Sequence, residues 1–189
     1  MCRDSVKKIV YGEGVTEIAS YANYHNWETS QLTELVLPST LRRIGIYAFY
    51  GTALPSLALP EGVETIYAHA FDGSHKMTTL SIPSTVVTMG SHAFANSPSL
   101  KEITFGNAVI GANCFEGCTG LETLVIPNNI TSIGNDAFNN CTGLKEVTLP
   151  IEQTKPSVFT GCSNVETITY TAQGDGVMPT RGTYSSNDR

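Results

Sequence analysis

The chain repeats one pattern about every 23 residues, and this period constrains its fold more than any other feature. Each unit opens on an apolar residue, and further apolar side chains follow at unit positions 4, 6, 10 and 13. A fixed period of about 20 to 29 residues is typical of a solenoid of the leucine-rich type. The units open at Val6, Leu32, Leu54, Met77, Leu100, Leu121, Leu144 and Val165.

The first part of each unit predicts a short strand. Stretches such as TELVLP, ETLVIP and KEVTLP alternate buried-type and polar or small side chains, and a Pro or Gly then ends the run. One coil cannot bury its apolar side alone, so neighbouring coils must stack and pair their strands in parallel. The predicted fold is therefore a mainly β leucine-rich-repeat solenoid, with a parallel sheet on one face and short turns or loops on the other.

An aromatic residue recurs after the small residue of each unit, as in Ala137-Phe138. Stacked coils bring these rings into one internal column, and each buried large side chain contributes about 1.5 to 3 kcal/mol. The column is predicted to contain Phe49, Phe71, Phe94, Phe115, Phe138 and Phe159.

Departures from the pattern divide the chain into three parts. Residues 1–31 have Asn23 where Phe is expected and carry Trp27, so they are predicted to form a variant N-terminal repeat or cap. Residues 32–170 hold the regular repeats, and residues 171–189 form a polar, Gly-rich tail. Within the repeats, the segment IEQTKPSVF replaces the usual second half of its unit, which predicts a rebuilt loop side there.

The unit at residues 121–143, LETLVIPNNITSIGNDAFNNCTG, resembles the BspA-like family of leucine-rich repeats, whose pattern is LxxLxIPxxVTxIGxxAFxxCxx. The resemblance covers residues 32–170 and extends more weakly over residues 6–31. It implies a secreted or surface protein that adheres to host matrix proteins or to other cells. It also implies no catalytic residues, because the family carries none over to this chain.

Composition excludes several classes of function. The net charge is −6, the pI is about 5.1 and the 11 Lys and Arg residues are dispersed, so no basic face for nucleic acid is expected. No apolar run reaches the roughly 18 residues that span a membrane. No signal-peptide pattern is visible either. The absence of this pattern is consistent with a cytosolic protein or with one whose targeting segment is absent from this sequence. The resemblance implies the second, an extracellular or surface protein, and a cytosolic location remains the alternative.

Three cysteines, Cys118, Cys141 and Cys162, occupy unit position 21 of successive coils, where earlier coils carry Thr or Ser. A position that accepts these three residue types predicts a small buried slot, since free Cys is commonly buried. The alternatives are a disulfide between stacked neighbours and a zinc site, for which Cys114 and Cys118 lack a second pair of ligands. Cys2 is expected to be an exposed thiol, with lipid attachment as the alternative.

His69 and His92 share one unit position in adjacent coils. They are predicted to belong to a row of solvated polar side chains on the loop face, with a shared metal as the alternative. No GxSxG, HExxH, phosphate-binding loop or calcium loop is present in the sequence. We therefore expect no enzyme activity, no cofactor and no metal.

The remaining candidate site is the exposed face of the parallel sheet, formed by unit positions 3 and 5. Solenoids commonly bind partners over such a face, and the predicted partner is a host matrix or bacterial surface protein. The alternatives are a structural spacer and a fragment of a longer array. A homodimer through the edge of the last strand, VETITYT, would cover an otherwise unpaired edge. The candidate residues are Glu34, Val36, Ser56, Thr79, Ser81, Glu102, Thr104, Thr123, Val125, Glu146 and Thr148.

Overall fold

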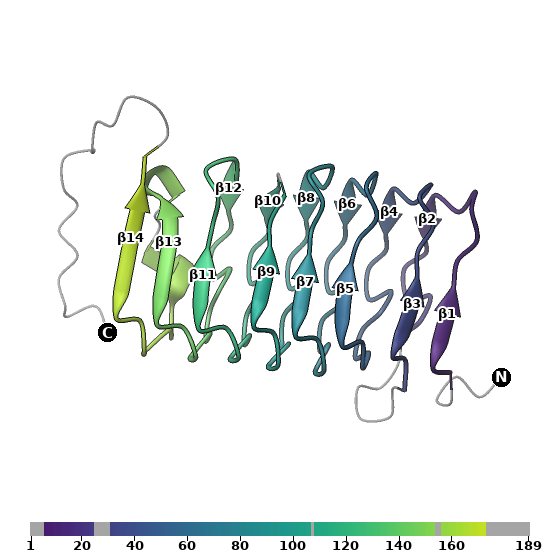
Figure 1. The fold of residues 1–189 in the computed structure, drawn as a ribbon, viewed down its shortest axis with the longest axis horizontal. Helices are drawn as coiled ribbons and strands as arrows, with labels where there is room; N and C mark the ends of the chain where they lie inside the picture. The colour runs from purple at the N-terminus through teal and green to yellow at the C-terminus, as the bar shows by residue number, and fades with distance from the viewer. Residues whose placement is uncertain (1–5, 25–30, 107, 154–155, 173–189) are drawn as a thin grey trace.

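The computed structural model describes residues 6–24, 31–106, 108–153 and 156–172, which wind into a parallel β-solenoid of about seven turns (Figure 1). The coils stack side by side along one axis, from the N-terminal end to the C-terminal end. The predicted leucine-rich-repeat solenoid is confirmed. The predicted features of Cys2, Trp27 and the tail from residue 173 lie outside the described residues.

Each coil contributes one strand to a front row, and neighbouring strands pair in parallel without a register shift. In β5, β7 and β9, for example, the apolar residues Leu57, Leu80 and Ile103 lie opposite one another. Hydrogen bonding divides the row into three sheets, β1-β3, β5-β7-β9 and β11-β13-β14. The strands are β1 (Lys8–Val10), β3 (Glu34–Val36), β5 (Ser56–Ala58), β7 (Thr79–Ser81), β9 (Glu102–Thr104), β11 (Thr123–Val125), β13 (Glu146–Pro150) and β14 (Thr167–Thr171).

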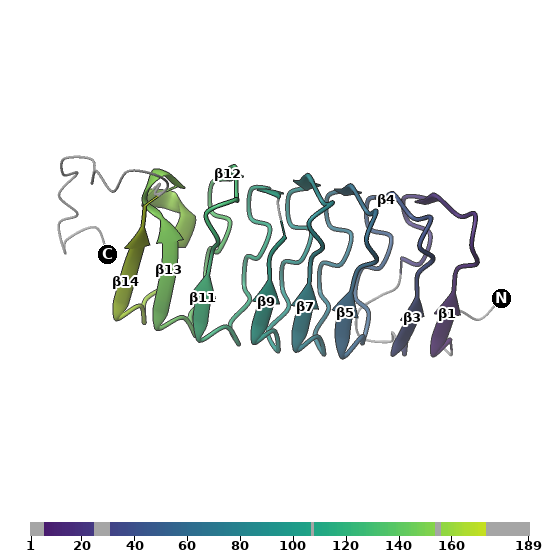
Figure 2. The ribbon, with the colours of Figure 1, turned by 45° about the horizontal axis from the view of Figure 1, so that its top comes forward.

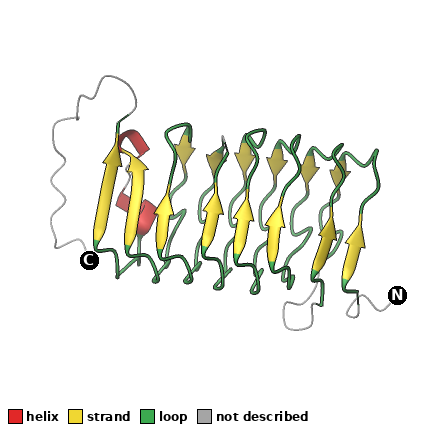
Figure 3. Cartoon of the chain, in the orientation of Figure 1, coloured by secondary structure: helices red, strands yellow, loops and turns green. Residues whose placement is uncertain are grey.

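A second row of strands runs along the back of the coils, on the side for which the sequence predicted only turns and loops (Figures 2 and 3). Each back strand has two residues, of which the second is buried and the first is exposed or half-buried. All six pair in one continuous parallel sheet. They are β2 (Glu17–Ile18), β4 (Arg43–Ile44), β6 (Thr65–Ile66), β8 (Thr88–Met89), β10 (Val109–Ile110) and β12 (Ser132–Ile133).

The coil between the back row and the next front strand contains two left-handed residues. In one coil these are His69, with φ 56°, and Gly73, with φ 77°. This backbone path directs the N–H groups of Phe71 and Gly73 to the next coil, where they donate to Ala93 and Ala95 at 2.8 and 2.9 Å. A third ladder of backbone hydrogen bonds therefore connects the coils and satisfies the polar groups of the turn.

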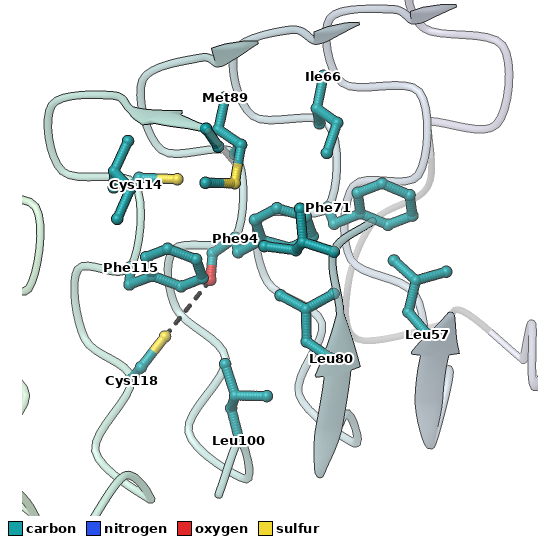
Figure 4. Packing of buried hydrophobic residues seen from close by; sticks show 14 of the residues in the cluster. Leu57, Ile66, Phe71, Leu80, Met89, Phe94, Leu100, Cys114, Phe115 and Cys118 are labelled. Carbon is teal, nitrogen blue, oxygen red and sulfur yellow. Dashed lines mark hydrogen bonds between the residues drawn. The ribbon is translucent and has the colours of Figure 1, made fainter. Parts of the chain in front are cut away.

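The predicted aromatic column forms the centre of the core. Successive rings stack with centroids 5.2 to 5.7 Å apart, from Phe49 to Phe159. Phe49, Phe71, Phe94, Phe115 and Phe138 are fully buried, and Phe159 in the last coil is half-buried. Figure 4 shows Phe71, Phe94 and Phe115 in a row between the leucines of the front strands and residues of the back row.

The two ends of the described stack depart from the regular coil. After β13, the short 3-10 helices η2 (Ile151–Gln153) and η3 (Pro156–Phe159) stand where a back strand would be, as the predicted rebuilding of this side implied. In the first coil, Asn23 takes the place of the column Phe, and its Nδ2 donates to the Tyr11 hydroxyl at 2.6 Å. The Tyr11 ring then packs edge-on against Phe49, with centroids 6.3 Å apart. An aromatic ring from the front strand side thus covers this end of the column.

Candidate functional site

The front row places the predicted candidate residues on one face of the coil stack. In β5, for example, Ser56 and Ala58 are exposed on either side of the buried Leu57. The same alternation holds at the candidate positions of β3, β7, β9, β11 and β13, with the exception that Thr148 is half-buried. It does not hold in the last strand, β14, where Ile168 is exposed. The alternation follows from the strand geometry, in which successive side chains point to opposite faces.

Five of these residues line a shallow depression of about 200 Å³ over β5, β7 and β9. The depression forms because the outward side chains of these three strands are short, and only one of them carries a charge. The remaining candidates lie on the flanking sheets, β1-β3 and β11-β13-β14, and do not line it. The predicted residues in the depression are Ser56, Thr79, Ser81, Glu102 and Thr104.

The acidic groups of this face differ in how they are neutralised. Glu34 lies 2.5 Å from the ammonium group of Lys8 in the neighbouring coil. Glu102, in the depression, makes no ion pair with any residue that the structure describes. The charge of Glu102 is therefore available to a partner, while that of Glu34 is already compensated by an exposed pair.

The cysteine column is part of the core, as predicted. Cys118 and Cys141 are fully buried and Cys162 is half-buried, and all three are free thiols. Each Sγ donates to the carbonyl of the column Phe in the preceding coil, as Cys118 does to Phe94 at 3.4 Å (Figure 4). Burial raises the pKa of Cys118 to about 12, so this thiol stays protonated and chemically inert.

His69 and His92 were predicted to be solvated, but the structure shows them only partly exposed. They are also not grouped with enough ligands for a metal. The two rings stack with centroids 4.7 Å apart, and Tyr47 stacks on His69 at 4.5 Å. His69 Nδ1 lies 2.8 Å from Asp72, and His92 Nε2 lies 3.3 Å from Glu116. Within residues 6–24, 31–106, 108–153 and 156–172, no three metal-ligating side chains form a cluster. Stacking and these carboxylates together explain why the histidines are only partly exposed.

The turns that precede the front strands lie along the lower edge of Figure 1. Residues of these turns line a larger groove, which the sequence did not predict. It has a volume of about 450 Å³, and we call it the turn groove. Asp72 is the one acidic residue that lines it and is the only charged side chain buried within the described residues. Burial, followed by the charge of Asp72, raises the pKa of Tyr50. The groove is lined by Tyr50, Asp72, Gly73, His75, Asn96, Pro98, Gly117 and Thr119.

The turn groove left only a weak trace in the sequence. Its residues belong to the variable end of each unit, where turn-forming residue types are expected whatever the function. The available signal was a column of positions one residue after each Phe, where Tyr50 precedes Asp72 in adjacent coils. Alignment of units by their apolar positions does not reveal which of these side chains are buried.

Residues 16–109 and 108–176 match the family model for the BspA type leucine-rich repeat region, in six copies. A search of curated proteins found no match. The structure contains no helix within its described residues that is long and apolar enough to cross a membrane.

Several solved structures of bacterial proteins share the fold. A leucine-rich repeat protein from T. pallidum is 28% identical over 88% of this chain and 71% of its own, with a TM-score of 0.61. The pneumococcal vaccine antigen PcpA is 26% identical over 75% of this chain and 38% of its own, also with a TM-score of 0.61. A leucine-rich cell surface protein from Faecalibacterium prausnitzii is 24% identical over 90% of this chain, with a TM-score of 0.60. This chain spans 61% of the length of that protein.

Proposed function

Since this chain belongs to the BspA-type leucine-rich repeat family, we propose that it is a non-catalytic interaction module of a cell-surface or secreted protein. Its partner would be a host matrix protein or a bacterial surface protein, bound on the exposed face of the front row. The observation that carries this proposal is the depression over β5, β7 and β9, in which Ser56, Thr79, Ser81, Glu102 and Thr104 come together. Leucine-rich repeat folds generally mediate protein interactions and are generally non-catalytic.

The surface chemistry supports binding of modest affinity that is spread over a large area of this face. Short Ser, Thr and Val side chains leave a flat surface, and the candidate residues of this face include none of the Trp, Tyr or Arg anchors that dominate tight interfaces. Glu102 adds a negative charge that favours a partner with a basic patch. Two of the similar proteins agree with a location at the cell surface. The F. prausnitzii protein is a cell surface protein, and PcpA is a vaccine antigen.

The competing proposal is a spacer, or one segment of a longer repeat array, without a ligand of its own. The last described strand, β14, pairs with β13 along one edge, and Ile168 in it is 46% exposed. Such an edge suits the addition of a further strand, from more coils or from a second copy. In addition to the binding face and the spacer, we therefore propose a homodimer through β14.

The decisive experiment is binding to immobilised fibronectin and fibrinogen across a salt series. The test variant carries Lys at Glu34, Glu102 and Glu146, all on the front face. A matched control carries Lys at Glu61, Glu152 and Glu166, which are exposed but lie outside the front-face positions, so both variants change the net charge equally. We expect saturable binding that the test variant changes, together with its salt dependence, and that the control retains.

The result also separates the two proposals. Equal effects of both variants would indicate a general charge effect and would contradict binding through the front face. Flat responses of all three proteins to both ligands would favour the spacer.

A further inference from the structure

We propose that the turn groove binds a neutral oligosaccharide, with one sugar ring against Tyr50 and sugar hydroxyl groups on Asp72 and Asn96. This site lies in the turns before the front strands, and its residues do not overlap those of the depression over β5, β7 and β9. The inference therefore does not depend on the protein-binding face.

The polar groups of the groove match a hydroxyl ligand. The Asp72 side chain is 9% exposed, accepts from Asn96 Nδ2 at 2.9 Å and lies 2.8 Å from His69 Nδ1. These two partners hold the carboxylate in place, and a carboxylate has about four acceptor positions, so further donors can bind. Asn96 adds an amide with both a donor and an acceptor next to it. A sugar hydroxyl both donates and accepts, and it can bond to the two side chains together.

Tyr50 provides the apolar surface that a sugar ring needs. Tyr24 from the preceding coil stacks on the Tyr50 ring, with centroids 5.2 Å apart and an interplanar angle of 19°. Because Tyr50 lines the groove and Asp72 follows it in the next coil, we infer that the ring face away from Tyr24 is turned toward the groove. The C–H groups of a pyranose ring pack on such a face, and the stack with Tyr24 fixes its orientation before a ligand arrives.

Glycine keeps the floor of the groove open. Gly73 and Gly117 have φ angles of 77° and 69°, which other residues except Asn adopt rarely. A Cβ atom at Gly117 would lie 3.1 Å from Asn96 Oδ1 and would crowd the amide. The same turn position therefore provides both the backbone shape of the coil and the space for a ligand.

Size and charge favour a neutral sugar chain over other ligands. The volume of about 450 Å³ lies in the usual range for small-molecule sites. The lining residues come from four adjacent coils, which at the usual strand spacing cover roughly 14 Å, the length of a few sugar rings. No Lys or Arg lines the groove, so phosphate, sulfate and acidic sugars lack a counter-charge. The alternative is an organic cation attracted by Asp72, and the experiment includes it.

The test uses two-dimensional ¹H–¹⁵N NMR of the full chain with maltotriose, cellotriose, triacetylchitotriose, lactose and spermidine as separate probes. We expect at least one neutral sugar to shift the amide signals of Gly73, Asn96 and Gly117 saturably, and spermidine to have no effect. Asp72→Asn keeps the shape of the side chain but removes its charge, and it should weaken sugar binding about tenfold.

Two further variants keep the test independent of folding. Thr119→Trp fills the groove from an exposed position and should abolish sugar binding without a change in the thermal melt. Tyr67→Ala removes an exposed tyrosine that lies outside the groove and should leave binding intact. The front-face Lys variant described above should also keep its sugar binding, which separates this site from the protein-binding proposal.

Three results would overturn the inference. The first is no saturable shift with any of the four sugars at about 10 mM, well above the range in which a specific site should fill. The second is sugar binding that Thr119→Trp leaves unchanged. The third is binding of spermidine in place of the sugars, which would assign the groove to cations.

Discussion

Tyr47, His69 and His92 adopt left-handed backbone angles, with φ of 53°, 56° and 55°. This conformation costs an aromatic side chain on the order of 1 kcal/mol. Two contributions offset the cost at His69: its N–H donates to Ser91 at 3.0 Å, and its ring stacks between Tyr47 and His92. The same left-handed backbone conformation thus recurs in the regular coils with different residue types at this position.

The cysteine column leads to a prediction about thiol reactivity. Burial raises the pKa of Cys118 to about 12, so about one molecule in ten thousand carries the thiolate at pH 8. The Cys141 thiol lowers the pKa of Cys162, which is also the only half-buried member of the column. In a Cys2→Ser background, a disulfide reagent at pH 8 should therefore modify Cys162 first, and Cys118 only as the protein unfolds.

Mass spectrometry of peptides at successive times measures the order of modification. A Cys162→Ser variant serves as the control and should show almost no fast reaction, with little loss of stability, since Ser74 and Ser97 occupy the same column. Rapid labelling of Cys118 in the folded protein would show that the core opens at this position.

At the scale of the element, the spacing of the coils depends on positions with no side chain. A Cβ atom at Gly134 would lie 2.4 Å from the backbone nitrogen of Ala112, and one at Gly111 would lie 2.5 Å from the Met89 carbonyl oxygen. Both contacts are with backbone atoms, so neither can be relieved by a change of rotamer. These glycines follow the back strands β12 and β10 and allow neighbouring coils to approach closely.

Gly134→Ala should therefore lower the free energy of unfolding by about 2 kcal/mol or more, because the two coils must separate. Gly12→Ala is the matched control, since no heavy atom lies within 4 Å of a Cβ at that position. Urea unfolding followed by circular dichroism measures both variants. Equal stabilities of the two variants would contradict the role of close backbone approach.

At the scale of the whole molecule, the strands of each coil pair only with those of adjacent coils, so the ends of the stack differ from its middle. At the C-terminal end, Thr171 also donates to Asn128, two coils back, at 2.6 Å. Strand β14 is hydrogen-bonded to β13, and no further described strand pairs with it. The Thr167 N–H donates to Lys145 at 3.0 Å, so the N–H of the next residue, Ile168, points to the opposite edge. Ile168 also places an exposed apolar side chain at this edge, which no further strand of the described residues covers.

We expect the protein to self-associate weakly through this edge, and Ile168→Lys to reduce the association. A charged side chain on an edge strand opposes strand addition, and the change does not touch the core. Sedimentation equilibrium over a range of concentrations measures the effect, with Val125→Lys, on the front face away from the edge, as the control. A wild-type protein that stays monomeric at all concentrations, or equal loss of association in both variants, would contradict association through β14.

Much of the architecture followed from local patterns. The period, the alternation around Leu124 and the column that includes Phe94 each depend on side chains at fixed spacing, so they predicted the coil, the front strands and the aromatic core. The buried cysteines followed from the same column argument. The back strands were not predicted, because two residues such as Thr65–Ile66 are too short to show a strand period.

The amino-acid sequence by itself thus determined the repeating coil, its parallel strands and its apolar core, since burial along a regular repeat is a property of each unit. The tertiary structure decided the stacking of Tyr47, His69 and His92 and the formation of the turn groove. These features depend on which variable side chains meet in adjacent coils and on how closely the coils approach. Tyr50, Asp72 and Asn96 come from three separate units and share one groove only after stacking, because the coils bring equivalent positions together at the distance of neighbouring strands.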